Sequence, residues 1–585
     1  MRSTVWFLSV VLLAAAMASC ARKAQPYPIR WVYVSRGLSD DQHVEDIRQI
    51  AKTASENGMN GIYLSAGFDG IDLKGEQYFR RLGEVKQIAE QYGMDIIPRC
   101  MDVGYNGSML AHNQNLAAGI PVREALFVAN GRRARHVPDS SVNLSNGGFD
   151  QVGKDGIPGW ELPGTLGQVA FVDSGEVVEG SVALRFENFG GNEDNPGRVV
   201  RTVAVSPDRL YRLKLWVKTS GMDESGAFGS GNFQVHVRGG QEKRELTYIR
   251  PRVGQDTDWT EVVIGFNSRG YDSAQIEVGM FGAQQGTFWL DGFSLKEIGM
   301  VNMLRRPGTP LTVRGEKNDV LYEEGVDFEP VADLDLDFNW DHDGPSLRLT
   351  PGSRISDGER LRIGFYHGVR VYQSQVTACM SEPQIYEVWR RTIPLIEKHL
   401  DPKYYFISVD EIRAGGTCAA CTGRSMTMGQ ILADCIGKQV EIVEEAAHGA
   451  ECVIWSDMID PNHNARDRHG HGYYYHVDGT FEDSWENIPR DLIVACWWHK
   501  MRYESLGHFS KLGHRTFGCG YYDKDDIAND STWVEALDET PGALGLMYTS
   551  WLNKFELLDE FGTMMNAHIV PEEIVKSWES YPVKN

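Results

Sequence analysis

The stretch Tyr404-Tyr-Phe-Ile-Ser-Val-Asp-Glu411 does more than any other to decide the fold of this chain. It is an apolar and aromatic run that ends in two carboxylates, and an amphipathic segment over residues 382–400 comes before it. A run of this kind after a helix is typical of a buried parallel strand. Barrels of alternating strands and helices carry their functional groups at the carboxyl ends of such strands. We therefore expect a barrel strand that presents Asp410 and Glu411 to a cavity.

Neighbouring carboxyl groups at a strand end can hold different protonation states, one a neutral acid and the other an anion. Cleavage of a glycosidic bond uses both forms. The alternative interpretation of Asp410-Glu411 is a helix N-cap followed by an acid in the first turn. The same dipeptide also begins at Asp223, Asp538 and Asp559, so only its place after the apolar run favours a functional role.

The composition limits the size of the domains and the class of partner. A chain of 585 residues is too long for one core, and two to four domains are expected. Its 42% apolar and 24% charged residues are those of an ordinary globular protein. The formal net charge of −23 argues against nucleic acid or an anionic membrane surface as a partner, because both attract basic proteins.

The first 20 residues have the pattern of an export signal. Arg2 supplies a positive charge, residues 5–17 are apolar, and Ala18-Ser19-Cys20 has the small residues of a cleavage site. The apolar stretch is too short to span a membrane. Its end resembles the bacterial lipobox, which implies that Cys20 becomes a lipid-bearing first residue; cleavage without lipidation is the alternative. We expect an exported protein held at the bacterial cell envelope by this lipid alone.

Strand and helix patterns alternate at both ends of the chain. The first part, over residues 28–140, shows three strands separated by helical patterns at 40–57 and 75–92. The second part, over residues 380–585, adds five more strands. We therefore predict an α/β fold, a (β/α)8 TIM barrel that is interrupted after its third strand. Its strands are expected at 29–35, 61–66, 94–100, 404–409, 451–456, 492–497, 516–520 and 545–550.

The interruption has the pattern of β structure. Residues 142–298 are rich in Gly and alternate apolar with polar residues, which predicts a β-sandwich. Its opening Gly148-Phe149 and Pro158-Gly-Trp160 and its closing Trp289-Leu-Asp-Gly-Phe293 resemble the galactose-binding-like jelly rolls of many carbohydrate-binding modules. A spacer domain without a ligand is the alternative. A second, smaller all-β segment is expected over residues 301–378.

Polar and aromatic residues follow nearly every predicted barrel strand, where they would face one cavity. Carboxylates suit the chemistry of a sugar substrate, indole faces stack on sugar rings, and Arg or Asn side chains bind hydroxyl groups. The candidate site residues are Arg36, Asp102, Asp410, Glu411, Trp455, Asp457, Trp497, Trp498, Tyr521, Asp523, Trp551 and Asn553.

The order of these residues resembles glycoside hydrolase family 20, the β-N-acetylhexosaminidases, or a distantly related family of the same clan. That family has an Asp-Glu pair after strand four, Trp on strands five and six, Tyr-x-Asp on strand seven and Trp-x-Glu on strand eight. The resemblance covers the barrel halves only and is strongest over residues 404–553. Three features depart from the family pattern: Phe-Ile-Ser-Val at 406–409 replaces His-x-Gly-Gly, Asn553 replaces the last Glu, and Arg36 matches the strand-one Arg only loosely.

The resemblance implies a cofactor-free, substrate-assisted retaining mechanism on N-acetylhexosaminides. Glu411 would protonate the leaving oxygen, Asp410 would support the attacking 2-acetamido group, and Tyr521 would donate a hydrogen bond to its carbonyl. Trp455, Trp497 and Trp551 would wall the acetamido pocket. If no acetamido group takes part, Asp457 would become a nucleophile or base; otherwise it is expected to bind a hydroxyl group.

Two other classes of function stay open on the sequence. One is a noncatalytic glycan-binding lipoprotein, although binding alone does not require an acid pair. The other is a zinc hydrolase that uses Cys418, Cys421 and the histidines 463, 469, 471 and 476. The identity of the sugar, exo or endo action and the oligomeric state are not predicted.

The cysteines and histidines themselves do not predict a metal site. Cys418-Ala-Ala-Cys421 lacks the second CxxC of a four-cysteine zinc site, so a disulfide within this loop is favoured. The four histidines show no ligand spacing and are expected to be exposed, some of them lining the substrate cleft. Buried thiols are expected at Cys100, Cys452, Cys496 and Cys519, which lie in apolar runs.

Overall fold

A computed structural model of the chain describes residues 25–154, 156–163, 166–189, 197–222, 233–251, 253–281, 285–371, 375–466 and 476–581. The expected export signal and Cys20 lie outside these residues. Within them, no helix combines the length and the apolar character needed to cross a membrane.

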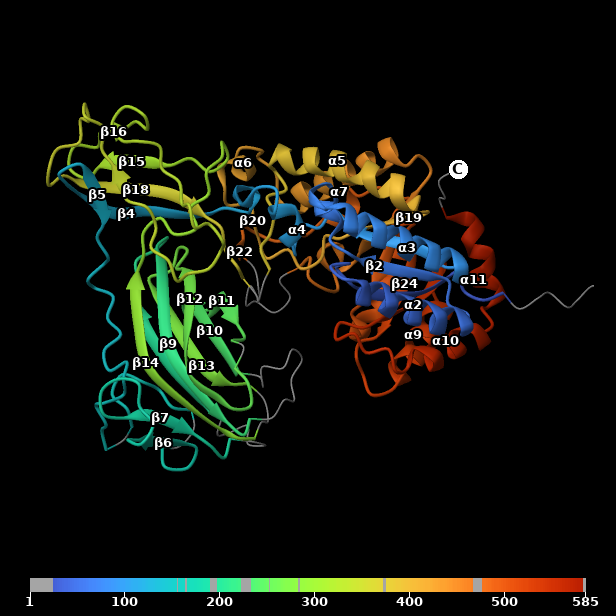
Figure 1. Ribbon diagram of the computed structural model, residues 1–585, viewed down its shortest axis with the longest axis horizontal. Helices are drawn as coiled ribbons and strands as arrows, with labels where there is room; N and C mark the ends of the chain where they lie inside the picture. Colours follow the sequence, from blue (N-terminus) through green and yellow to red (C-terminus); the bar gives the residue numbers. More distant parts are fainter. Residues whose placement is uncertain are drawn as a thin grey trace, which may run out of the picture.

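Eight parallel strands close into a barrel (Figure 1). Its interior is packed with aromatic and aliphatic side chains, among them Trp31, Tyr63, Phe406 and Phe517. Each strand was expected from its apolar run, and the ends agree to within a few residues. The strands, in barrel order, are β1 (Ile29–Ser35), β2 (Gly61–Ser65), β3 (Asp95–Cys100), β19 (Tyr404–Ile407), β21 (Glu451–Trp455), β23 (Ile493–Cys496), β24 (Arg515–Tyr521) and β25 (Ala543–Thr549).

Helices that follow or precede these strands bury their apolar faces against the outside of the barrel. The Asp40 side chain caps α2, and Thr427 with Gln430 forms a capping box at the start of α7, which satisfies otherwise free backbone N–H groups. The main helices are α2 (Asp41–Glu56), α3 (Glu76–Tyr92), α5 (Pro383–Leu400), α7 (Met428–Ala446), α8 (Arg502–Lys511), α9 (Ala528–Asp538), α10 (Leu558–Ala567) and α11 (Glu572–Ser577).

The strands between β3 and α5 form a separate lobe beside the barrel (Figure 1). One part of this lobe is a six-stranded antiparallel sheet with the order β16-β15-β18-β4-β5-β17. Its strands are β4 (Ile120–Asn130), β5 (Arg133–His136), β15 (Thr312–Gly315), β16 (Leu321–Tyr322), β17 (Leu347–Arg348) and β18 (Arg360–His367).

The sequence-based boundary of the first barrel part at residue 140 differs from this arrangement. Strands β4 and β5 lie before that boundary, yet β4 pairs along its length with β18 of the inserted sheet. The two strands form a hairpin with a two-residue turn, in which Gly131 has a φ of 57°. Gly tolerates this left-handed conformation, so the hairpin forms locally and carries the chain away from the barrel.

The remaining insertion strands form a two-sheet sandwich with a core of its own, including Phe186, Leu213, Phe266 and Phe288. One sheet has the order β11-β10-β13-β8 and the other β12-β9-β14-β7-β6. The strands are β6 (Ala170–Asp173), β7 (Ala183–Phe186), β8 (Arg198–Ala204), β9 (Leu210–Ser220), β10 (Phe233–Gly239), β11 (Arg244–Ile249), β12 (Thr257–Asn267), β13 (Ser273–Met280) and β14 (Thr287–Glu297).

Candidate active site

The acid pair lies directly beyond β19, on backbone shared with the segment that follows β3. Ser408 N–H donates to the Cys100 carbonyl over 2.9 Å, and Val103 N–H donates to the Ser408 carbonyl over 2.9 Å. Gly104 then lies against the acid pair so closely that a Cβ atom there would stand 1.9 Å from the Asp410 carbonyl oxygen. The backbone of residues 100–104 thus fixes the position of both carboxylates.

Asp410 is mostly buried and belongs to a polar group built from β3 and β19. Its Oδ1 accepts a 2.6 Å hydrogen bond from the Ser408 hydroxyl and lies 3.6 Å from the Arg99 guanidinium. Arg99 also donates to Ser408 Oγ over 2.9 Å and forms a 2.6 Å ion pair with Asp102. Burial raises the pKa of Asp102 to about 7, against the attraction of Arg99. Asp102 is itself buried, so its contact with Arg99 makes it a support for that side chain and not an exposed substrate-binding group.

Glu411 is the more accessible acid, with 24% of its side chain exposed. Oε2 accepts hydrogen bonds from the Tyr105 hydroxyl and, over 3.0 Å, from the Gln375 side chain. Oε1 forms a 3.1 Å ion pair with Arg413, whose side chain is buried. The residue has a φ of 47°, a left-handed conformation that is unusual outside Gly. Contacts from three segments thus orient this carboxyl group.

Asp457 lies beneath the pair and is completely buried. Its Oδ2 accepts from the backbone N–H of Glu411 over 2.9 Å and from the Asn464 side chain over 3.1 Å. Its Oδ1 makes no hydrogen bond. Burial, and then repulsion by Asp410, raises the pKa of Asp457 to about 8, so the carboxyl is neutral near pH 7. Its contacts are those of a support for Glu411.

Aromatic rings form a continuous floor beside these acids. Tyr63 packs on Phe406 with ring centres 4.2 Å apart and meets Trp455 at 5.8 Å. Tyr33 bridges Tyr63 and Trp551 at 5.1 and 5.2 Å. Trp551 is 37% exposed, so the outer part of this floor is open to a ligand. Flat, partly exposed rings next to carboxylates fit the face of a sugar ring.

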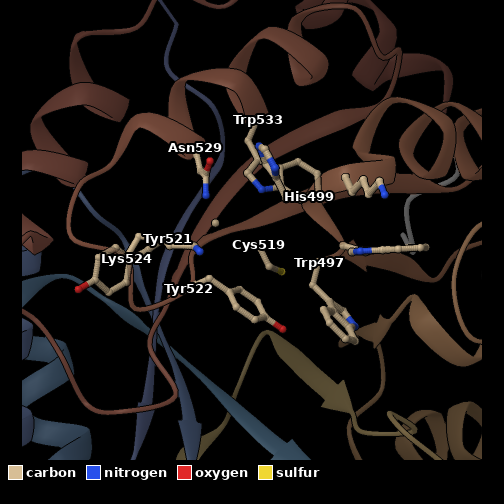
Figure 2. A pocket seen from close by; sticks show the side chains of 11 residues that line it. Trp497, His499, Cys519, Tyr521, Tyr522, Lys524, Asn529 and Trp533 are labelled. Atoms are coloured by element: carbon tan, nitrogen blue, oxygen red, sulfur yellow. The ribbon is translucent and has the colours of Figure 1, made fainter. Parts of the chain in front are cut away.

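Tyr521 does not join this group, contrary to the sequence-based expectation, and Tyr522 does. The Tyr521 ring stacks on Tyr548 at 4.1 Å, on the outer side of the barrel wall. Figure 2 shows the two tyrosines pointing in opposite directions, with the Tyr522 hydroxyl turned toward Trp497. The Tyr522 and Trp497 rings are 6.0 Å apart and nearly parallel. Burial, and then the charge of Glu411, raise the pKa of the Tyr522 phenol.

The backbone conformation at the end of β24 explains why Tyr522, and not Tyr521, points toward Trp497 (Figure 2). Phe517 and Cys519 point into the barrel, so strict alternation would also point Tyr521 inward. Tyr521 and Tyr522 instead have φ values of 64° and 60°, which breaks the alternation at the strand end. Tyr521 N–H donates to Asp530 Oδ1 over 2.6 Å and holds this turn.

A cavity of about 280 Å³ opens behind Trp497 and Tyr522 at the ends of β23 and β24 (Figure 2). Trp498 and His499 line it as well. On the other side, Trp498 stacks on His463, with ring centres 4.7 Å apart. This cavity is therefore lined in part by the aromatic side chains Trp497, Trp498 and Tyr522.

Three of the predicted hydroxyl-binding residues have structural partners. Asp523 accepts hydrogen bonds from the Ser550 hydroxyl over 2.6 Å and from the backbone N–H of Trp551 over 2.8 Å. It therefore fixes the loop that carries Trp551. Arg36 donates to Asn553 and forms a 2.9 Å ion pair with Asp46. The Arg36–Asn553 hydrogen bond connects the loop after β25 to the loop after β1.

The four histidines of residues 463–476 were expected to be exposed, but the two that the structure describes, His463 and His476, are not. His463 packs against Trp497 and Trp498, and burial lowers its pKa to about 3. His476 is buried and hydrogen-bonds the Leu246 carbonyl of the sandwich. His469 and His471 lie outside the described residues. Tertiary packing on the sandwich and on the Trp side chains explains the difference.

The expected disulfide between Cys418 and Cys421 is also absent, since all eight cysteines in the described part of the chain are free. Their Sγ atoms are 3.6 Å apart and share a buried group with Cys379, a residue that no sequence pattern singled out.

Sequence reasoning missed several contacts of the acids. Arg413 lies only two residues after the pair, so its position in the sequence could have indicated an ion pair with Glu411. A buried cation needs such a partner. Tyr105, Gln375 and Asn464 come from distant segments and had no such local signal. Gln375 comes from the end of the insertion, so the inserted lobe contributes directly to the site.

Comparison with known proteins adds little to this geometry. No family model matches the sequence, and no curated protein matches it. Similar solved structures include a rhamnosidase from Novosphingobium sp. PP1Y, at 9% identity and a TM-score of 0.33, over 89% of this chain and 55% of that one. A family 16 carbohydrate-binding module matches at 18% identity and a TM-score of 0.19, over 26% of this chain and 99% of the module.

The N-terminal cellulose-binding domain of a Cellulomonas fimi β-1,4-glucanase matches at 19% identity and a TM-score of 0.17, over 26% of this chain and 93% of that domain. These identities and TM-scores are too low to carry an argument about function. The resemblance to glycoside hydrolase family 20 stays a prediction.

Proposed function

We propose that this protein is a glycoside hydrolase that acts on glycans with a 2-acetamido sugar. One observation carries the proposal: Asp410 and Glu411 follow β19 at the carboxyl end of the barrel, the end at which Trp551 packs with Tyr33 and Trp455. This is where barrels of this kind place catalytic groups. The combination supplies carboxyl groups for the chemistry and ring faces for the sugar.

Glu411 is assigned the transfer of a proton to the leaving oxygen. It is the accessible carboxyl of the pair, and Tyr105, Gln375 and Arg413 hold its two oxygens in fixed directions. A bound sugar must replace one of these contacts. General acid catalysis of this type contributes about 10²–10⁴-fold to the rate.

Asp410 and Tyr522 are assigned to the acetamido group. Asp410 is oriented by Ser408 and Arg99, and in this role it would accept from the acetamido N–H. The Tyr522 phenol would donate to the acetamido carbonyl as that oxygen attacks the anomeric carbon. Tyr522 takes the role expected of Tyr521, because its side chain points toward Trp497 (Figure 2) and its phenol is the one on which the charge of Glu411 acts.

The burial of Asp457 supports substrate assistance. A protein nucleophile must reach the anomeric carbon, whereas Asp457 is 0% exposed and gives one oxygen to the Glu411 backbone. The acetamido oxygen supplies a nucleophile without any protein group. We further propose that the protein works outside the cytoplasm on a glycan, held at the cell envelope by a lipid on Cys20.

A panel of aryl glycosides tests the proposal. Turnover of 2-acetamido glycosides should exceed that of the matching plain glucosides and galactosides, and a thiazoline mimic of the cyclised intermediate should inhibit strongly. Equal turnover of both classes would remove the assisted mechanism while leaving a glycosidase. No turnover of any glycoside, together with measurable glycan binding, would make the protein a binding protein.

A further inference from the structure

Three buried thiols meet at the place where the insertion joins the barrel. Cys379 lies just before α5, whereas Cys418 is the N-cap of α6 (Ala419–Thr422) and Cys421 lies within it, after the acid pair. The Sγ atoms form a nearly equilateral triangle: Cys379 is 3.6 Å from Cys418 and 3.7 Å from Cys421, and the latter two are 3.6 Å apart. All three side chains are buried.

The size of this triangle fits one bound ion. A tetrahedral Zn²⁺ with Zn–S bonds of about 2.3 Å separates its sulfur ligands by about 3.8 Å. A disulfide needs sulfur atoms about 2.05 Å apart, and pairing two of three thiols would leave the third buried and alone. Thiolates are ligands that select zinc among the common divalent ions.

The surroundings also suit a negatively charged thiolate cluster. The buried Arg306 guanidinium approaches Cys418 Sγ to 3.9 and 4.0 Å, and its Nη1 forms a 3.2 Å ion pair with Glu382. Three thiolates around Zn²⁺ carry one net negative charge, and Arg306, which also pairs with Glu382, places its positive charge beside them.

We propose that Cys379, Cys418 and Cys421 bind a structural zinc ion that fastens the loop carrying the active-site residues to the root of the insertion. Three thiolates leave one position of a tetrahedral ion for a further donor, which we do not assign. The site is separate from the acid pair, so this inference does not depend on the proposed hydrolase activity.

The contacts around the cluster show what the ion would hold together. Arg306, from the insertion, donates to the Ala117 carbonyl over 2.9 Å, and Ala118 N–H donates to the Thr377 carbonyl over 2.7 Å. Ala419 N–H, between the two loop cysteines, donates to the Gly308 carbonyl over 3.0 Å. The outgoing and returning ends of the insertion and the loop after β19 therefore converge on the three thiols.

Two connections lead from this junction to the acids. Gln375, four residues before Cys379, donates to Glu411, and Arg413 N–H donates to the Thr377 hydroxyl over 3.3 Å. A metal that fixes Cys379 against Cys418 would thus fix two contacts of the active-site loop. Its loss should lower stability and loosen the orientation of Glu411.

Metal analysis of the full chain tests the site. Protein purified without chelator should contain about one zinc per chain by plasma mass spectrometry, and Cys418→Ser should lose most of it. Cys435→Ser is the matched control, because Cys435 is also buried but lies in α7, outside the cluster. The control should keep its zinc.

Two further measurements cover a variant that fails to fold. Replacement of zinc by Co²⁺ in the parent should give a thiolate-to-metal charge-transfer band in the near ultraviolet. Alkylation of denatured, unreduced parent should modify all three cluster cysteines, as judged by peptide mass spectrometry. Folded parent that takes up neither zinc nor cobalt would overturn the proposal, and so would a disulfide that links two of the three.

Discussion

The backbone N–H of Glu411 donates a 2.9 Å hydrogen bond to Oδ2 of Asp457, an acid with no exposed surface. The second oxygen of Asp457 has no hydrogen-bond partner. The backbone of Glu411, the accessible acid, is therefore bound by Asp457. Burial raises the pKa of Asp457 to about 8 and keeps its carboxyl neutral at pH 7. This relationship links the stability of the fold to the geometry of the site.

Substitution Asp457→Asn should change how stability depends on pH. Asp457 has a raised pKa in the folded state, so between pH about 4 and about 8 the folded protein binds a proton that the unfolded chain releases. Parent stability should therefore fall as pH rises through this window. An Asn side chain can accept from Glu411 N–H without titrating, so the variant should lack this component.

Thermal unfolding checks this prediction. From pH about 5 to about 9, the Tm of the parent should fall relative to that of Asp457→Asn, by about 1 °C for each kcal/mol in a chain of 585 residues. Asp102 is present in both proteins, so its own raised pKa largely cancels in the comparison. Parallel pH profiles would show that Asp457 does not titrate in this window.

The tyrosine pair offers a matched comparison of two neighbouring hydroxyl groups. Tyr522→Phe should lower kcat by about 10²-fold or more, because it removes a donor aimed at charge that develops in the transition state. Tyr521→Phe keeps the ring that stacks on Tyr548 and should change kcat little. Steady-state kinetics on a 2-acetamido aryl glycoside measures both. The reverse order of effects would return the role to Tyr521.

The barrel was predictable because its strands are buried apolar runs, whose pattern depends on their own residues alone. The position of Tyr521 was not, because three successive residues with positive φ, Tyr521 to Asp523, override the alternation that the sequence implies. The hairpin of β4 and β5 was overlooked because its sheet partner, β18, lies more than two hundred residues later.

The contacts of the site show the same limit. Asp410 and Glu411 were found from one local pattern, whereas Gln375 reaches Glu411 only because the insertion returns to the barrel beside it. Cys379 joins the CxxC motif for the same reason. Local sequence patterns identify such groups one at a time, and tertiary packing decides which of them meet.

Gly104 should be required for activity far more than for folding. A Cβ atom there would stand 1.9 Å from the Asp410 carbonyl oxygen, so Gly104→Ala must displace the acid pair. A misplacement of about 1 Å in an active site can cost about 10²-fold in rate. Gly107→Ala is the control, because its Cβ would meet nothing within 4 Å. We expect kcat to fall by about 10²-fold in the first variant and to stay near the parent value in the second.

Substitution Glu411→Gln separates proton donation from binding. The amide keeps the shape of the side chain but cannot protonate the leaving oxygen. Glycosides with poor leaving groups need that proton, so their turnover should fall by about 10²–10⁴-fold. Activated nitrophenyl glycosides need it far less and should be affected much less. The comparison is made as kcat/KM over a series of leaving groups, with circular dichroism to confirm that the variant is folded. A loss of equal size along the whole series would mean that Glu411 acts in binding or in support of the acetamido group, and the proton donor would have to be sought elsewhere in the site.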